Sequence, residues 1–193
     1  MKQDIIYRAM QTADFDAVIE LGNRIHGHGY VNAQQMKQWF EQGIKDGINA
    51  NYVAYHGDKL VGFRITFAAQ QFTLDKWYTP TAWRTPIEQT AYFKCNSVDE
   101  NYQRCGIGST LLKRAVQALQ AQGAKAGVSH LWRQSPGNSA VEYFTKCDGQ
   151  LVKDHPGKWN EDSKNGYTCT ICANDCHCVA AEMIIYFDSA HQQ

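Results

Sequence analysis

The chain has 193 residues, 19 lysines and arginines against 19 aspartates and glutamates, and 44% hydrophobic residues. This composition excludes a disordered chain and predicts a single folded domain over residues 1–193. The zero net charge argues against a protein that binds nucleic acid or a membrane surface through a global positive field. No apolar run approaches the roughly 20 residues that span a bilayer, and Arg8, Gln11 and Asp14 interrupt any apolar signal core. We therefore expect a cytoplasmic protein.

Strand and helix patterns follow one another in the order β-α-α-β-β-β-α-β-α-(β)-β. The expected elements are a strand at 4–10, a helix capped by Thr12, a helix at about 33–42, a hairpin over 51–69 that turns at 56–59, a strand at 90–98, a helix that stops at Gly123, a strand at 124–132, a short helix within 135–147 and a C-terminal strand at 178–187. Residues 71–89 show no regular pattern. This order predicts a mixed α/β domain with a sheet wrapped by helices.

A glycine-containing loop joins the strand at 90–98 to the following helix. Gly106 and Gly108 stand one residue apart at the helix start, where backbone N–H groups are unpaired and the helix dipole is positive. Because glycine lacks a Cβ, an anion can approach the amides of residues 105–109, with Arg104 adding charge and Ser109 a hydroxyl. A phosphate or pyrophosphate is the expected ligand, and a tight turn with nothing bound is the alternative. The loop lacks the Gly-Lys-Ser/Thr end of a P-loop and the third glycine of a dinucleotide fingerprint.

Two blocks of the sequence resemble one known family. The eleven residues Val98-Asp99-Glu100-Asn101-Tyr102-Gln103-Arg104-Cys105-Gly106-Ile107-Gly108 are similar to the acetyl-CoA-binding motif of the GNAT superfamily of N-acetyltransferases. That motif reads Val, three variable positions, an aromatic residue, then Gln/Arg-x-x-Gly-x-Gly/Ala, and Glu100 stands where proline is frequent. The later block GNSAVEYFTKCDG resembles the GNAT segment Asn-x-x-Ala-x-x-x-Tyr-x-Lys-x-Gly, although Asn138 is one residue out of register with Ala140 and Lys146.

The resemblance implies a GNAT-like fold and a donor substrate. The fold would be an α/β (α+β) domain with a mostly antiparallel sheet of six to seven strands, splayed between the fourth and fifth. Acetyl-CoA would give its acetyl group to an amine of a small molecule or peptide. The implied cofactor-binding residues are Asn96, Ser97 and Val98 along the pantetheine arm, and Gln103, Arg104, Cys105, Gly106, Ile107, Gly108, Ser109 and Asn138 around the remainder.

The catalytic residues depart from the family pattern. The family usually has tyrosine, as the acid for the leaving thiolate, at the position that aligns with Phe144; here Tyr143 lies one residue earlier. One helical step turns a side chain by roughly 100 degrees, so Tyr143 is either this acid or a surface or core tyrosine. Candidate bases are Glu100 and His130, with His26 and His28 as further candidates. His130 could equally be a hydrogen-bonded core histidine, and the segment 26–30 either an acceptor-lining loop or a flexible turn.

Four of the seven cysteines lie within ten residues near the C-terminus, at Cys169, Cys172, Cys176 and Cys178. They are numerous enough to hold a tetrahedral zinc ion. We expect a hairpin over residues 169–178 that turns at 173–175, which would put Cys169 on the other face from the remaining three. Three interpretations are open: a structural metal site, reduced cysteines in a buried hairpin, and a Cys172–Cys176 disulfide, which a cytoplasmic setting disfavours.

These observations support two classes of function. The first is an acetyl-CoA-dependent N-acetyltransferase, and the second is a non-catalytic acyl-CoA-binding module whose cysteine cluster senses a metal or redox state. The aromatic residues of segment 72–83 could form an acceptor wall, a homodimer contact or part of the core. We expect neither a nucleic-acid nor a membrane partner.

Overall fold

The computed structural model describes residues 4–187. The strands are Ile5–Ala9 (β1), Ile44–Lys45 (β2), Ile48–Asn49 (β3), Tyr52–His56 (β4), Lys59–Phe67 (β5), Thr90–Val98 (β6), Ala126–Trp132 (β7), Gln150–Pro156 (β8) and Val179–Tyr186 (β9). The α-helices are Phe15–His26 (α1), Ala33–Gln42 (α2), Ile107–Ala121 (α3), Ser139–Lys146 (α4) and Asn160–Lys164 (α5). The predicted elements all occur in the predicted order, with β8 as the strand in parentheses, but the short helix α5 between β8 and β9 was not expected. The first helix was expected from Thr12, but a 3-10 turn at Thr12–Asp14 precedes it, and the small hairpin of β2 and β3 was not expected.

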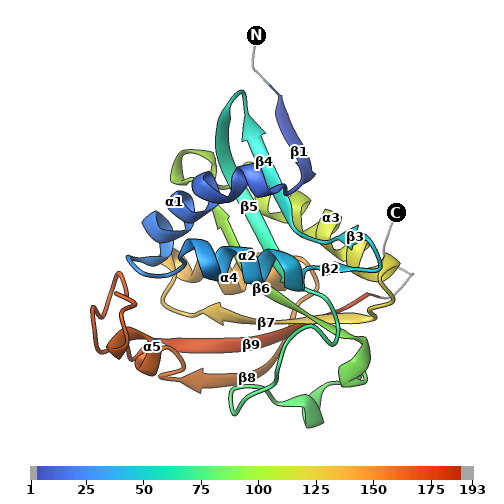
Figure 1. The fold of residues 1–193 in the computed structure, drawn as a ribbon. Helices are drawn as coiled ribbons and strands as arrows, with labels where there is room; N and C mark the ends of the chain where they lie inside the picture. Colours follow the sequence, from blue (N-terminus) through green and yellow to red (C-terminus); the bar gives the residue numbers. More distant parts are fainter. Residues whose placement is uncertain (1–3, 188–193) are drawn as a thin grey trace.

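Seven strands form one sheet in the order β1-β4-β5-β6-β7-β9-β8. Neighbouring strands are antiparallel except β6 and β7, which run parallel. Helices α1 and α2 cross one face of the sheet, and α3 and α4 lie behind it (Figure 1). This arrangement confirms the predicted fold class. No helix in the described part of the chain is both long and apolar enough to cross a membrane.

The two helical layers are held by apolar stripes with helical spacing. In α3, Ile107, Leu111, Ala115 and Leu119 are buried, and the first two pack on Val61 of β5. On the opposite face, α1 and α2 cover Phe63, Ile65 and Phe67 of the same strand. The sheet therefore separates two packed layers, and β5 and β6 contribute side chains to both.

Strands β6 and β7 pair only at one end. Their parallel ladder joins Thr90–Tyr92 to Ala126–Val128 and stops there, although β6 continues to Val98. The register between β5 and β6 shifts by one residue, from Ile65↔Cys95 to Thr66↔Phe93, so Lys94 is an extra residue that bulges from β6. Beyond the ladder, the Ser129 hydroxyl donates to the Phe93 carbonyl at 2.8 Å. The fourth and fifth strands of the prediction correspond to β6 and β7, because the prediction did not include β2 and β3. The expected splay therefore lies at this place in the sheet.

The irregular segment 71–89 covers the sheet near β9 and is anchored by a buried carboxylate. Glu182 of β9 is fully buried. It accepts hydrogen bonds from the Thr79 backbone at 2.9 Å and Trp83 Nε1 at 2.9 Å, and it pairs with His155 Nε2 at 2.8 Å. Phe72 and Tyr78 pack against the core beside Trp83. The aromatic residues of this segment therefore extend the core.

Replacing Glu182 with alanine should detach this segment. The change leaves the Thr79 amide, the Trp83 indole and His155 without their buried acceptor, and each unsatisfied buried group costs about 1–3 kcal/mol. We expect the free energy of unfolding in urea to fall by about 3 kcal/mol or more and proteolysis within 71–89 to accelerate. The exposed Glu88 lies in the same segment, and Glu88→Ala should change stability by no more than about 0.5 kcal/mol. Equal unfolding free energies for the two variants would contradict the anchoring role.

Candidate active site

The loop before α3 presents a row of backbone N–H groups without acceptors. Arg104 and Gly106 both have left-handed backbone angles, with φ of 60° and 78°. Within residues 4–187, no backbone N–H from Arg104 to Ser109 donates a hydrogen bond. Consecutive amides in such a turn at a helix N-terminus form an anion-binding concavity. The buried Ile107 side chain fixes this loop to the core, while the Ser109 hydroxyl donates to the Gly106 carbonyl at 3.1 Å.

A buried carboxylate that we did not predict holds the start of this loop. Asp99 is fully buried and pairs with Arg24 of α1 at 3.0 Å and with Lys59 of β5 at 2.9 Å. It also accepts a hydrogen bond from the backbone of Asn101 at 3.0 Å. Burial alone would raise the pKa of Asp99, but the hydrogen bonds from Lys59 and Arg24 outweigh burial and hold that pKa well below its usual range. Asp99 thereby ties the loop to two core elements.

Three buried polar atoms, from β5, from β6 and from the start of α4, have no partner in the described residues. They are Arg64 Nε, Asn96 Oδ1 and Asn138 Oδ1. Arg64 of β5 lies opposite Asn96 of β6 in the sheet, and a Cβ on Gly108 would contact the Asn96 amide at 3.4 Å. Buried polar atoms are rarely left unpaired. A polar chain such as the expected pantetheine arm, with its amide groups, fits this place.

Tyr143 lies between these groups and α3. Its hydroxyl donates to the Gly108 carbonyl at 2.8 Å and accepts from Arg64 Nη2 at 3.1 Å. Burial raises the pKa of Tyr143, although the neighbouring Arg64 cation opposes that shift, so the phenol is protonated at neutral pH. The next residue, Phe144, is fully buried against Phe93. Tyr143, and not Phe144, therefore faces the gap. Sequence reasoning missed Arg64 because nothing near it in the chain marks it.

The predicted bases His130, in β7, and Glu100, after β6, form no hydrogen bond to Tyr143 in the described part of the chain. His130 Nδ1 pairs with the Tyr92 hydroxyl at 3.1 Å, and Nε2 contacts the Trp77 carbonyl. Burial first, and then the Lys158 cation, lower the pKa of His130 to about 3. Glu100 is exposed after β6. Among residues 4–187, no hydrogen bond or ring contact joins Tyr143 to His130 or Glu100.

Of the histidines in the α1–α2 connection, His26 reaches β6. Its Nε2 pairs with the Ser97 hydroxyl at 2.9 Å, and its ring lies 4.4 Å from the Tyr30 ring. Burial, assisted by the Lys94 cation, lowers the pKa of His26 to about 4. His28 is exposed. Ser97 points to the α1 face of the sheet, opposite to Asn96.

The segment 26–30 is a packed connection and not a free turn. A Cβ on Gly27 would collide with the Thr168 carbonyl, and one on Gly29 with the Gly166 carbonyl. The Thr168 amide donates to the His28 carbonyl at 2.9 Å. The two backbones therefore lie in direct contact, which only residues without a Cβ allow.

The four clustered cysteines come together, but not through the expected hairpin. The amides and carbonyls of Cys169 and Ala173 bond to each other at 3.0 Å in both directions, and Ala173 is left-handed with φ of 55°. The chain closes a tight loop at 169–173, followed by a turn and a bend at 174–175, and no pair of strands flanks the turn as the hairpin prediction required. Because no extended strand alternates its side chains here, Cys169 shares the cluster with Cys172, Cys176 and Cys178. None of the seven cysteines forms a disulfide.

Comparison with known proteins agrees with this geometry. Residues 15–149 match the model of the acetyltransferase (GNAT) family. This match spans most of the chain and includes the loop before α3, and it therefore defines the class of protein as a GNAT acetyltransferase. The chain belongs to the acetyltransferase (GNAT) family, which confirms the predicted resemblance and the predicted enzyme class, an acyltransferase. No curated protein matches the sequence.

Several solved structures share the fold at low sequence identity. An N-acetyltransferase from Staphylococcus aureus Mu50 aligns with a TM-score of 0.67 and 15% identity over 96% of this chain and 99% of that one. The ribosomal-protein-S18-alanine N-acetyltransferase from Escherichia coli aligns with a TM-score of 0.66 and 15% identity over 98% of this chain and 98% of that one. A putative acetyltransferase from Salmonella typhimurium, solved with its cofactor acetyl-CoA, aligns with a TM-score of 0.67 and 15% identity over 97% of this chain and 96% of that one. At these identities the likeness concerns the fold alone.

The two depressed histidine pKa values predict a loss of stability in mild acid. Since the pKa of His130 and of His26 is lower in the folded state than the ordinary value of 6.5, the unfolded chain binds more protons as the pH falls. The free energy of unfolding should therefore decrease from about pH 6.5 towards pH 4. His130→Gln should flatten this decrease in urea titrations, whereas exposed His28→Gln should keep the wild-type slope. Identical slopes for all three proteins would contradict the burial argument.

Proposed function

We propose that this enzyme transfers the acetyl group of acetyl-CoA to an amine of a small molecule or peptide. One observation carries the proposal: the row of unbonded amides from Arg104 to Ser109 opens beside the gap between β6 and β7, where Tyr143 points inward. An anion site next to a widened sheet edge suits a long cofactor with a pyrophosphate at one end and a reactive thioester at the other. The predicted cytoplasmic location and homodimer stay predictions.

The chain's own residues offer contacts along the whole cofactor. The amides of residues 104–109 would bind the pyrophosphate, and the exposed Arg104 side chain adds positive charge. Asn96, Asn138 and Arg64 supply the buried polar atoms that lack partners, which suits the amides of the pantetheine arm. Acetyl-CoA supplies an activated acetyl group as its thioester.

Two proton transfers accompany the reaction. A nitrogen–carbon bond forms between the amine and the acetyl carbonyl carbon, the carbon–sulfur bond breaks, and the sulfur leaves with the electron pair. We assign Tyr143 as the acid that protonates this sulfur, with Arg64 at 3.1 Å stabilising the phenolate. His26, neutral above a pH of about 4, together with Ser97, is the proposed acceptor of the amine proton. In this assignment His130 and Glu100 are the less favoured bases.

The surroundings of His26 bear on the acceptor. Lys94 and Lys158 are half-buried on this side, and neither forms an ion pair among residues 4–187. Burial lowers the pKa of both amines. Asp162 acts on both lysines from a distance, and Asp75 and Glu182 act on Lys158. Because no carboxylate pairs directly with either amine, an acceptor that carries a carboxylate or phosphate near its amine is favoured. A thiol-release assay with acetyl-CoA should therefore begin with amino acids and acidic peptides. CoA binding without thiol release across amines of every charge would instead support the non-catalytic module.

Tyr143→Phe tests the assigned acid. The variant keeps the ring but cannot protonate the leaving sulfur. Because a CoA thiolate is a tolerable leaving group, we expect kcat to fall by about 10- to 100-fold, at or below the low end of the usual effect of a general acid, with acetyl-CoA affinity kept within a few-fold. The control Tyr186→Phe alters a half-buried tyrosine of β9 whose ring contacts Arg84. A wild-type kcat in Tyr143→Phe would remove Tyr143 from the mechanism.

Gly108→Trp tests the cofactor position. A side chain at residue 108 points at Asn96 and Tyr143, since a Cβ there would lie 3.4–3.5 Å from both. An indole would fill the gap, and we expect at least a 100-fold weaker affinity for CoA in calorimetry. Gly108→Ala adds one methyl group at ordinary contact distances and should keep measurable binding. Unchanged affinity in the tryptophan variant would overturn the placement of the cofactor.

A further inference from the structure

The loop that carries the four cysteines has almost no core of its own. Residues 157–178 connect β8 to β9, with only the short helix α5 inside them. The buried residues of this connection are Ser163 and the cysteines 169, 176 and 178. A segment that cannot bury enough apolar surface usually needs a covalent or metal cross-link. In this connection, three of the four buried side chains are cysteines, and none is a large hydrophobic residue.

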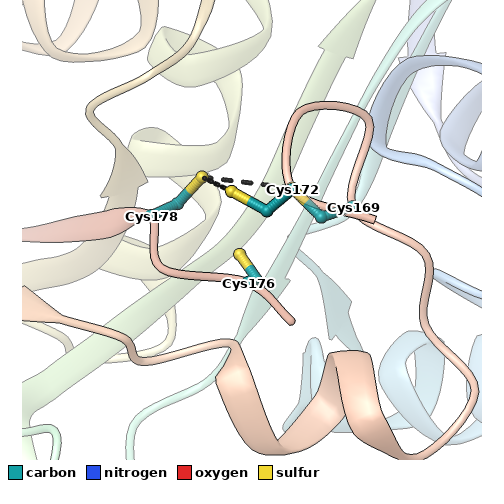
Figure 2. A group of neighbouring side chains, drawn as sticks. All are labelled: Cys169, Cys172, Cys176 and Cys178. Carbon is teal, nitrogen blue, oxygen red and sulfur yellow. Dashed lines mark hydrogen bonds between the residues drawn. The ribbon is translucent and has the colours of Figure 1, made fainter. Parts of the chain in front are cut away.

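The four sulfur atoms are placed as a tetrahedral metal site requires. All four Sγ atoms lie within 4.8 Å of one another. Cys178 Sγ lies 3.6 Å from Cys172 Sγ and 4.0 Å from Cys169 Sγ. Zinc–sulfur bonds of about 2.3 Å in a tetrahedron separate the sulfurs by about 3.8 Å. Figure 2 shows the thiols of Cys172, Cys176 and Cys178 pointing toward one another.

Backbone N–H groups lie close to two of the four sulfurs. The loop closed by Cys169 and Ala173 directs backbone hydrogen bonds from Ile171 and Cys172 to Cys169 Sγ. Cys176 Sγ accepts another from the backbone of Cys178. Hydrogen bonds that N–H groups donate to sulfur stabilise the negative charge of metal-bound thiolates.

The shell around the sulfurs closes the site. Trp132, Trp159 and Tyr167 pack against the cysteines. The Cys176 amide donates to the buried Ser163 hydroxyl at 2.9 Å, and Asn160 Nδ2 donates to the Cys176 carbonyl at 3.1 Å. Four protein ligands with no open position are typical of structural zinc sites, whereas catalytic sites keep one position for water.

We propose that Cys169, Cys172, Cys176 and Cys178 bind one structural zinc ion that stabilises the connection between β8 and β9. Four cysteine thiolates in a tetrahedral set suit zinc, whereas magnesium, calcium and manganese prefer oxygen ligands. The proposal excludes the Cys172–Cys176 disulfide, because that bond would remove two of the four ligands.

The site also orders the neighbouring α1–α2 connection. Tyr167, two residues before the first cysteine, donates through its hydroxyl to the His26 carbonyl at 2.9 Å. The Thr168 amide donates to the His28 carbonyl at 2.9 Å. In Figure 1, the connection before β9 lies next to the loop between α1 and α2. Zinc at the cysteines would therefore fix the position of His26, a consequence that rests on the proposed function.

Metal content and spectroscopy of the full-length protein test the site. Protein purified under reducing conditions without chelator should contain one zinc per chain by plasma mass spectrometry. After removal of zinc with a chelator, Co²⁺ should bind and give the visible absorption of tetrahedral thiolate coordination. Cys172→Ser alters the most accessible ligand, and its zinc content should fall to a small fraction. Cys105→Ser and Cys147→Ser, outside the cluster, should keep zinc.

The outcomes separate this proposal from the proposed reaction. Zinc removal should increase hydrogen exchange at residues 26–30 and 166–178, whether or not the enzyme is active. Gly108→Trp should lose CoA binding and retain zinc. Wild-type protein without near-stoichiometric zinc and without Co²⁺ uptake would overturn the zinc site. A mass two hydrogens lower than that of the fully reduced chain, localised to Cys172 and Cys176, would overturn it in favour of the disulfide.

Discussion

The candidate active site depends on a single irregularity in the sheet, the extra residue Lys94 in β6. The ladder between β6 and β7 ends after three paired residues, two residues before the bulge, and bulges bend the strand that carries them. Just past the ladder, the Ser129 hydroxyl donates to the Phe93 carbonyl. Past this point the β6 side chains still alternate, so Asn96 faces α3 while Ser97 faces α1. A gap between two strands whose side chains serve both faces would let a cofactor on one face meet an acceptor on the other, as the proposed function requires. A flat ladder would have closed this route.

The loop that follows β6 must be rigid if its amides are to be aligned before any anion arrives. Asp99 provides that rigidity, because one fully buried carboxylate binds cations from α1 and β5 and also a backbone amide of the turn. Asp99 compensates only one of the two positive charges of Arg24 and Lys59, and Arg104 forms no ion pair among residues 4–187, so the surroundings of the loop stay positive. A chain of zero net charge can therefore present a local anion site. Preorganised amides of this kind lose little entropy on binding.

The sequence predicts best those parts of the candidate site whose residues are contiguous in the chain. The eleven residues from Val98 to Gly108 carry the strand end, the turn and the first helical amides in one continuous stretch, so the loop could be placed from the sequence. Arg64 and the Asp99 ion pairs could not, because their partners lie far away in the chain. The role of Tyr143 depended on which of two adjacent side chains enters the core, and the packing of Phe144 on Phe93 decides that. The prediction of a cysteine hairpin was wrong because it required side chains to alternate between the two faces of a strand. In the structure, the left-handed backbone of Ala173 closes a loop instead.

The matched family region ends at residue 149, and the elements beyond it build much of the face around His26. Glu182 on β9 anchors the aromatic segment 71–89, and residues 166–168 pack against the backbone of residues 27–29. If His26 accepts the amine proton as proposed, acceptor recognition on this face would depend on parts of the chain that lie outside the matched region. The loop before α3, where the cofactor would bind, lies entirely inside it. The class of reaction therefore follows from the family, whereas in the proposed assignment much of the acceptor face would come from the C-terminal quarter of the chain. The glycines at 27 and 29 join the two regions, because any larger residue would push the proposed zinc-bound connection away from His26.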